Sequence, residues 1–170
     1  DVVLWTTMIG MYVRYGNGTE ALELFDKMEE NGIKPDLLSY VNALSACMCP
    51  NVLTKGESLH ARIKEEGFES DIVARTAIMG MYARCGDFQA AHIVFDIILG
   101  KDVVAWGTLM SAYVQHGLDC NALYLYGEMH QERMLPDKGI FLLALKACGR
   151  FGALLEGKLI YQHMIEVGMD

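Results

Sequence analysis

Apolar residues recur along the chain with the spacing of amphipathic helices. From Trp5 onward they fall at i, i+3, i+4, i+7 and i+8, which gathers them on one face of a helix. A glycine-containing turn at 16–18 interrupts this series, and a second one begins at Ala21. Asn31 and Gly32 end the second series. The pattern therefore predicts two helices joined by a short turn, a helical hairpin.

The hairpin is repeated along the chain. Shifting the sequence by 101 residues superimposes Trp5, Tyr12, Gly16, Ala21 and Pro35 on Trp106, Tyr113, Gly117, Ala122 and Pro136. An aspartate closes each unit, which predicts repeats at 2–36, 37–71, 72–102 and 103–137 and a partial repeat at 138–170. One hairpin cannot bury its own apolar faces, so neighbouring hairpins are expected to stack. The sequence predicts an all-α solenoid, a single array over residues 1–170.

Composition narrows the class of protein. With 52% apolar and 21% charged residues, the chain is typical of soluble globular proteins. No apolar run is long enough to span a bilayer, and no signal-peptide pattern is present, so no membrane partner is expected. The five cysteines lack the spacing of zinc sites, since Cys47 and Cys49 are only two apart. We expect reduced cysteines and no metal or other cofactor.

The net charge of −8 argues against nucleic acid as a partner, but the acidic residues are unevenly placed. The predicted first helices of the units contain no Asp or Glu; they span about 4–15, 38–48, 73–85, 104–116 and 138–150. The same segments carry Arg14, Arg75, Arg84, Lys138, Lys146 and Arg150. Because exposed charges are screened beyond ~8–10 Å, the local sign matters more than the total. One basic face and one acidic face are predicted.

The first three units resemble a known family. The first carries VVLWTTMIGMYVRYGNGTEALELFDKMEENGIKPD, the second carries ALSAC and KGESLHARIKEEGFESD, and the third carries IVARTAIMGMYARCGDFQAAHIVFD. They resemble pentatricopeptide repeats, specifically the plant subgroup that cycles through long, short and standard units. Tetratricopeptide repeats share the hairpin and usually bind peptides, but the terminal Pro-Asp and the unit lengths of 35 and 31 residues favour the first family. The resemblance implies a right-handed superhelix whose first helices face single-stranded RNA.

The resemblance also assigns roles to individual residues. The fifth and last residues of each unit would read a base, namely Thr6, Asp36, Val41, Asp71, Thr76, Asp102, Gly107, Asp137 and Leu142. The second residues would sandwich it, namely Val3, Leu38, Val73 and Val104. Arg14, Arg84 and Arg150 share the thirteenth position and would contact phosphates. The alternatives are structural: the aspartates are also good helix N-caps, and the arginines are also ordinary solvated side chains near helix ends.

Base preference follows from hydrogen-bond chemistry. An ionised Asp only accepts hydrogen bonds, so it suits guanine or uracil, which present N–H on the pairing edge. In the family a Thr at the fifth position goes with purines, so Thr6 with Asp36 and Thr76 with Asp102 resemble the guanine combination. Gly107 has no side chain and Val41 is apolar, so weak discrimination is expected there. We predict a preference for G-N-G.

No catalytic motif stands out. His130-Gln131-Glu132 has the H-x-E spacing of zinc deaminases, but no Cys-x-x-Cys follows it. The predicted function is a sequence-selective single-stranded RNA-binding module without a small-molecule substrate. By resemblance it would specify sites for C-to-U editing or other RNA processing in mitochondria or chloroplasts, with editing or processing proteins as partners. A deaminase-like domain elsewhere in a longer chain would be compatible with this function. The alternatives are a protein-interaction scaffold of the tetratricopeptide type and, less favoured, a dimerisation array.

Overall fold

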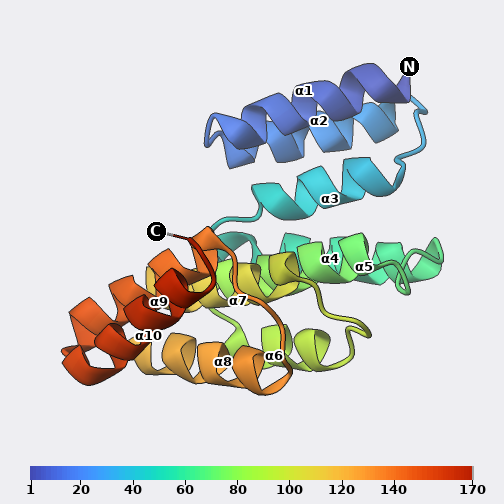
Figure 1. The fold of residues 1–170 in the computed structure, drawn as a ribbon. Helices are drawn as coiled ribbons and strands as arrows, with labels where there is room; N and C mark the ends of the chain where they lie inside the picture. Colours follow the sequence, from blue (N-terminus) through green and yellow to red (C-terminus); the bar gives the residue numbers. More distant parts are fainter. Residues whose placement is uncertain (170) are drawn as a thin grey trace. The chain divides into compact units, whose positions relative to one another are not determined.

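The computed structural model describes residues 1–169, and these residues contain α-helices, one short 3-10 helix and no strand. The helices are α1 (Val2–Arg14), α2 (Gly18–Glu30), α3 (Leu37–Ala46), α4 (Leu53–Glu65), α5 (Ile72–Arg84), α6 (Phe88–Asp96), α7 (Val103–Gln115), α8 (Asp119–Gln131), α9 (Lys138–Phe151) and α10 (Leu154–Glu166), with the 3-10 helix at Pro50–Val52. They form five consecutive hairpins (Figure 1). The predicted all-α fold of helical hairpins is confirmed.

The chain divides into two compact units, at residues 1–99 and 100–170. The division falls within the predicted third repeat, 72–102, and separates its two helices from its closing aspartate. Each unit is a stack of hairpins in its own right. The single array over the whole chain stays a prediction.

Unit 1 arranges its helices in two layers. The first helices of its hairpins lie side by side, with α3 packed against both α1 and α5, while α2, α4 and α6 form the second layer (Figure 1). Between the layers lie fully buried apolar side chains, among them Ile9, Phe25, Tyr40, Ile63 and Ile78. The helical periodicity of the sequence thus brings one face of every helix into a common core.

Ion pairs link the second helices of unit 1. Arg62 of α4 pairs with Glu29 of α2 and lies over the rings of Phe25 and Tyr40, 5.6 and 5.4 Å from their centroids. Lys55 of α4 pairs with Asp26 of α2. Part of the negative charge predicted for these helices therefore stabilises the stacking of one hairpin on the next.

Unit 2 repeats the two-layer arrangement with α7 and α9 as first helices and α8 and α10 as second helices. Trp106, Tyr113 and Phe141 are its largest buried side chains. Between α8 and α10, the Tyr126 hydroxyl is 2.8 Å from Nδ1 of His163. Burial raises the pKa of Tyr126 to about 12, so this hydroxyl stays protonated at neutral pH.

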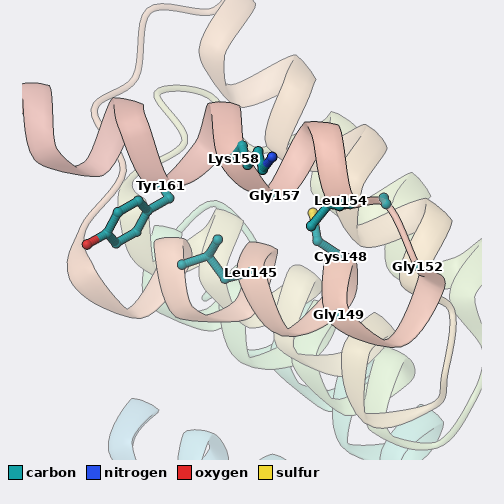
Figure 2. A pocket seen from close by; sticks show the side chains of 9 residues that line it. Leu145, Cys148, Gly149, Gly152, Leu154, Gly157, Lys158 and Tyr161 are labelled. Atoms are coloured by element: carbon teal, nitrogen blue, oxygen red, sulfur yellow. The ribbon is translucent and has the colours of Figure 1, made fainter.

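An apolar pocket of about 400 Å³ lies between α9 and α10 (Figure 2). Its lining includes Leu145, Cys148, Gly157 and Tyr161. Gly56 of unit 1 is the register equivalent of Gly157, and it is covered by α5. A Cβ placed on Gly56 would lie 2.4 Å from Sδ of Met81. The pocket therefore corresponds to a surface on which another helix packs in unit 1.

Among residues 1–169, no helix combines the length and the hydropathy needed to cross a bilayer. Within the same range, the side chains of His, Cys, Asp and Glu form no group of three or more that could hold a metal ion.

Candidate nucleic-acid interface

The closing aspartates all cap first helices. The Asp36 carboxylate accepts a hydrogen bond from the Ser39 amide at 2.8 Å, and Asp71 accepts one from Val73 at 2.8 Å. Asp1, Asp102 and Asp137 accept the same kind of bond from the amides of Val3, Ala105 and Ile140. The capping interpretation is therefore confirmed. It does not occupy the whole carboxylate, because Asp36, Asp102 and Asp137 remain exposed to solvent.

The four residues predicted to sandwich bases are exposed aliphatic side chains. Val3, Leu38, Val73 and Val104 have between 51% and 63% of their surface accessible, each in the first turn of a first helix. Exposed aliphatics in a repeated position, beside exposed carboxylates, form a surface with both apolar and acceptor character. We call the part of this surface in unit 1 the aliphatic–aspartate row: Val3, Asp36, Leu38, Asp71 and Val73.

A depression of about 300 Å³ lies in the aliphatic–aspartate row. It is lined by Asp36, Leu37, Leu38, Val41 and Val73. Leu38 and Val73 come from successive repeats, and Val41 is the predicted reading position between them. Unit 1 thus brings two predicted sandwich residues and two predicted reading residues, Asp36 and Val41, to the same concavity.

Thr6 is more buried than we expect of a residue that contacts a base directly. Only 4% of its surface is exposed, and its Oγ1 is 2.6 Å from Oγ of Ser39, which is fully buried. The Ser39 hydroxyl in turn donates to Oδ1 of Asp36 at 2.7 Å. The predicted pair of Thr6 and Asp36 is therefore brought together, but through a third side chain. Asn42 also donates from its side chain to the Thr6 carbonyl at 3.0 Å, which fixes α1 against α3.

Gly107 occupies in unit 2 the register of Thr6 in unit 1, and its neighbour is apolar. A Cβ placed on Gly107 would lie 3.6 Å from Cδ1 of Ile140, an ordinary contact distance. Ile140 is buried and stands where unit 1 has Ser39. The fourth repeat therefore has no side-chain hydroxyl in either position.

Three other predicted reading residues, Thr76, Asp102 and Leu142, lie in different surroundings. Thr76 is half-buried on α5, and its predicted partner Asp102 caps α7 in the other unit, so their pairing stays a prediction. Leu142 on α9 is exposed, with 57% of its surface accessible.

The arginines at the thirteenth position make contacts within the protein. The Arg84 guanidinium donates to the Leu44 carbonyl at 3.1 Å, near the C-terminus of α3. Arg150 donates to the Val114 carbonyl of α7 at 2.6 Å and pairs with Asp119 at 3.4 Å. Both arginines thereby bind a carbonyl near the C-terminal end of the neighbouring first helix, where backbone acceptors lack helical partners and cations are favoured. Among the described residues, Arg14 reaches only the Gly10 carbonyl of its own helix, at 3.4 Å. Their contact with phosphates stays a prediction.

The Arg84 side chain is partly buried, which affects its charged guanidinium. Burial lowers the pKa of the Arg84 guanidinium, and its Nε has no hydrogen-bond partner among the described residues. Burial also raises the pKa of the nearby Cys47 thiol to about 11. A thiol with such a pKa is protonated at neutral pH, so Cys47 is an unreactive core residue. All five cysteines are free.

Ser39 and Asn42 are the interface residues that the sequence analysis missed. Asp36 and Ser39 have the spacing of a capping box, and the box is present: the Asp36 amide lies 3.4 Å from Oγ of Ser39. That spacing could have identified Ser39 as a local partner of Asp36. Its contact with Thr6, 33 residues away in sequence, depends on the stacking of α1 on α3 and has no local signal.

Comparison with known proteins agrees with this architecture. A family model described as the PPR repeat family matches residues 1–49, and one described as the PPR repeat matches residues 104–134. Pentatricopeptide repeat-containing protein At5g27110 of Arabidopsis thaliana is 37% identical over 94% of this chain, which covers 23% of that protein. Two other Arabidopsis thaliana relatives are At1g56690, named mitochondrial, and At4g35130, named chloroplastic. They are 35% and 33% identical over 96% and 98% of this chain. The chain covers 23% and 20% of their lengths.

Solved structures show the same fold. The pentatricopeptide repeat protein PPR10, in complex with an 18-nt psaJ RNA element, superimposes with a TM-score of 0.77 over 99% of this chain, at 19% sequence identity. The match covers 25% of that protein. PPR10 from maize superimposes with a TM-score of 0.69 at 23% identity, over 99% of this chain and 24% of its own. The chain spans about a quarter of the length of these proteins. With its repeats, its paired helices and these matches, the chain belongs to the pentatricopeptide-repeat family.

Proposed function

We propose that this chain binds single-stranded RNA through the aliphatic–aspartate row of unit 1 and the equivalent first turns of unit 2. The observation that carries the proposal is the depression between Leu38 and Val73, with Val41 and Asp36 in its lining. Two aliphatic side chains from successive repeats flank a concavity that also has a carboxylate. A nucleobase suits such a site, because it is a flat ring with hydrogen-bond donors on its edge. That PPR10 was solved in complex with an RNA element supports the same ligand class.

Binding would combine two contributions. Apolar contact with both faces of a base contributes ~1–3 kcal/mol per base and tolerates any sequence. Exposed carboxylates at the helix N-caps then discriminate among bases, because an ionised Asp accepts from a base N–H and repels a ring acceptor. We expect the first repeat, with Thr6 and Asp36, to prefer guanine. The fourth repeat, with Gly107, would discriminate weakly.

In the whole protein, this module would specify sites for C-to-U editing or another RNA-processing reaction, with editing or processing proteins as partners. The unit lengths of 35 and 31 residues support membership of the plant subgroup that alternates long, short and standard repeats. Relatives named mitochondrial and chloroplastic support action in an organelle.

Binding of fluorescently labelled single-stranded RNA, measured by anisotropy at several salt concentrations, tests the proposal. Affinity for RNA should fall steeply with salt, as it does when phosphates are contacted. Replacing Leu38 and Val73 by Asp should weaken binding at least about tenfold, since two base-stacking contacts are lost. Ile93→Asp provides the matched control, because Ile93 is equally exposed but lies on the second helix α6.

Failure of these RNA-binding results would favour a protein-interaction scaffold. If folded protein shows no salt-dependent RNA binding, or if Ile93→Asp weakens it as much as the Leu38 and Val73 changes, the proposal is wrong.

A further inference from the structure

Ser39 links Thr6 to Asp36 in the first repeat. Its hydroxyl has one proton and two lone pairs, and the structure shows a partner for each. The proton goes to Oδ1 of Asp36 at 2.7 Å, because an ionised carboxylate can only accept. The Asp36 amide lies 3.4 Å from one lone pair, and Thr6 Oγ1 lies 2.6 Å from the oxygen.

The direction of the Thr6–Ser39 bond follows from this arrangement. Since the single proton of Ser39 is used by Asp36, the short bond between the two hydroxyls must be donated by Thr6. The proton of Thr6 is then directed into the protein. Neither Thr6 nor Asp36 retains a proton that could be donated to a ligand.

We propose that Ser39 is a positioning residue that makes the first repeat reject bases with a ring acceptor on the pairing edge. This proposal rests on the RNA-binding function proposed above. Adenine and cytosine carry such an acceptor and would need a donor that the site lacks. Guanine and uracil carry a ring N–H, which the free oxygen of Asp36 can accept. Selectivity by exclusion of this kind is stronger than a favourable contact alone, because an unpaired acceptor loses its bond to water.

Burial supports a fixed geometry. Ser39 is fully buried and Thr6 is 4% exposed, so bulk water does not break the bond between the two hydroxyls. The register equivalent of Ser39 for the pair Thr76 and Asp102 is Ala105, which has no hydroxyl. A guanine preference at the third repeat would therefore lack this source of exclusion.

The test is the ratio of affinities for guanine and adenine RNAs, measured with wild type, Ser39→Ala and the control Ser45→Ala. Ser45 lies on the same helix, and its hydroxyl donates to the Val41 carbonyl of that helix, at 2.8 Å. The probes are cytidine tracts containing G-C-G, A-C-G or G-C-A. The guanine that responds to Asp36→Asn is assigned to the first repeat.

Ser39→Ala frees the Thr6 proton, so the preference for guanine over adenine at that position should fall about two- to tenfold, the effect of one hydrogen bond. The preference at the other guanine, and both preferences in Ser45→Ala, should stay unchanged. In a Thr6→Val background, Ser39→Ala should not lower the ratio further, because no hydroxyl proton remains to be freed.

Three outcomes are decisive. A ratio unchanged by Ser39→Ala in a protein that binds RNA overturns the role of Ser39 and leaves RNA binding standing. Wild type that binds no RNA overturns the proposed function itself. If circular dichroism shows that Ser39→Ala is not helical, Ser39→Cys is measured in its place, since a thiol keeps the volume of the hydroxyl and is a weak donor. An unchanged ratio of affinities in Ser39→Cys also overturns the proposal.

Discussion

Two sites in the same register, one in each unit, share an aspartate but differ in two of the residues that lie near it. In unit 1, Thr6 and Ser39 connect to Asp36 through hydroxyl groups. In unit 2, Gly107 and Ile140 stand at the same two positions, next to Asp137. The helices that hold the sites begin at equivalent residues, so the backbone is not the source of the difference. The fold provides the aspartate and its cap, and the side chains around it decide what that aspartate can distinguish.

The largest expected effect is the loss of the aspartate at the site with the hydroxyl network. Asp36→Asn introduces an amide that can donate to a ring acceptor, so preference at the first repeat should move from guanine towards adenine by about tenfold or more. Asp137→Asn should move it less, because Gly107 offers no second contact. Anisotropy titrations with matched guanine and adenine RNAs check both variants. Equal shifts in the two variants would show that the difference between Thr6 and Gly107 does not affect base preference.

Grafting the network into unit 2 is the next strongest test. Gly107→Thr with Ile140→Ser should give the fourth repeat a preference for guanine over adenine of about two- to tenfold. Gly107→Thr alone should give less, since its hydroxyl would face the apolar Ile140 and its proton would stay free. The same RNA pairs measure the gain, and thermal unfolding monitors the cost of replacing the buried Ile140. A full gain from the single change would contradict the need for a serine.

Arg84 and Arg14 share a register, and only Arg84 bonds to a neighbouring first helix. Without RNA, Arg84→Ala should lower the free energy of unfolding by about 1–3 kcal/mol, because a buried carbonyl contact is lost and a cavity is left. Arg14→Ala should change it by less than about 0.5 kcal/mol. Thermal or urea unfolding of the protein alone measures both. If Arg84 acted only on phosphates, neither variant would differ from wild type.

The smallest expected effect is on pH dependence. Burial lowers the pKa of His60, whose Nδ1 lies 3.0 Å from the Tyr82 hydroxyl, whereas Tyr161 has this register in unit 2. A depressed folded-state pKa means that the unfolded chain binds protons first. Stability therefore falls as pH drops below the ordinary histidine value near 6.5 and stops falling below the folded value. His60→Gln should flatten this slope in unfolding measurements between pH 8 and pH 5; an unchanged slope would assign it to other groups.

The sequence predicted the fold well because the relevant information is local and repeated. Helical spacing from Trp5 onward and the closing aspartates locate the first helices, which begin at most two residues before the predicted positions. The exposed second-position aliphatics, such as Leu38, were also predictable, because their register repeats. Thr6 was assigned a direct reading role, and its burial against Ser39 was not foreseen. That contact, like the bond from Arg84 to Leu44, joins different hairpins and depends on how they stack.

The central claim is that a base lies between the first turns of successive first helices. Nuclear magnetic resonance of methyl-labelled protein with a guanine-containing RNA tests it directly. We predict nuclear Overhauser effects from base protons to the methyl groups of Leu38 and Val73. Effects confined to exposed methyl groups of second helices, such as Ile93 of α6, would contradict the account.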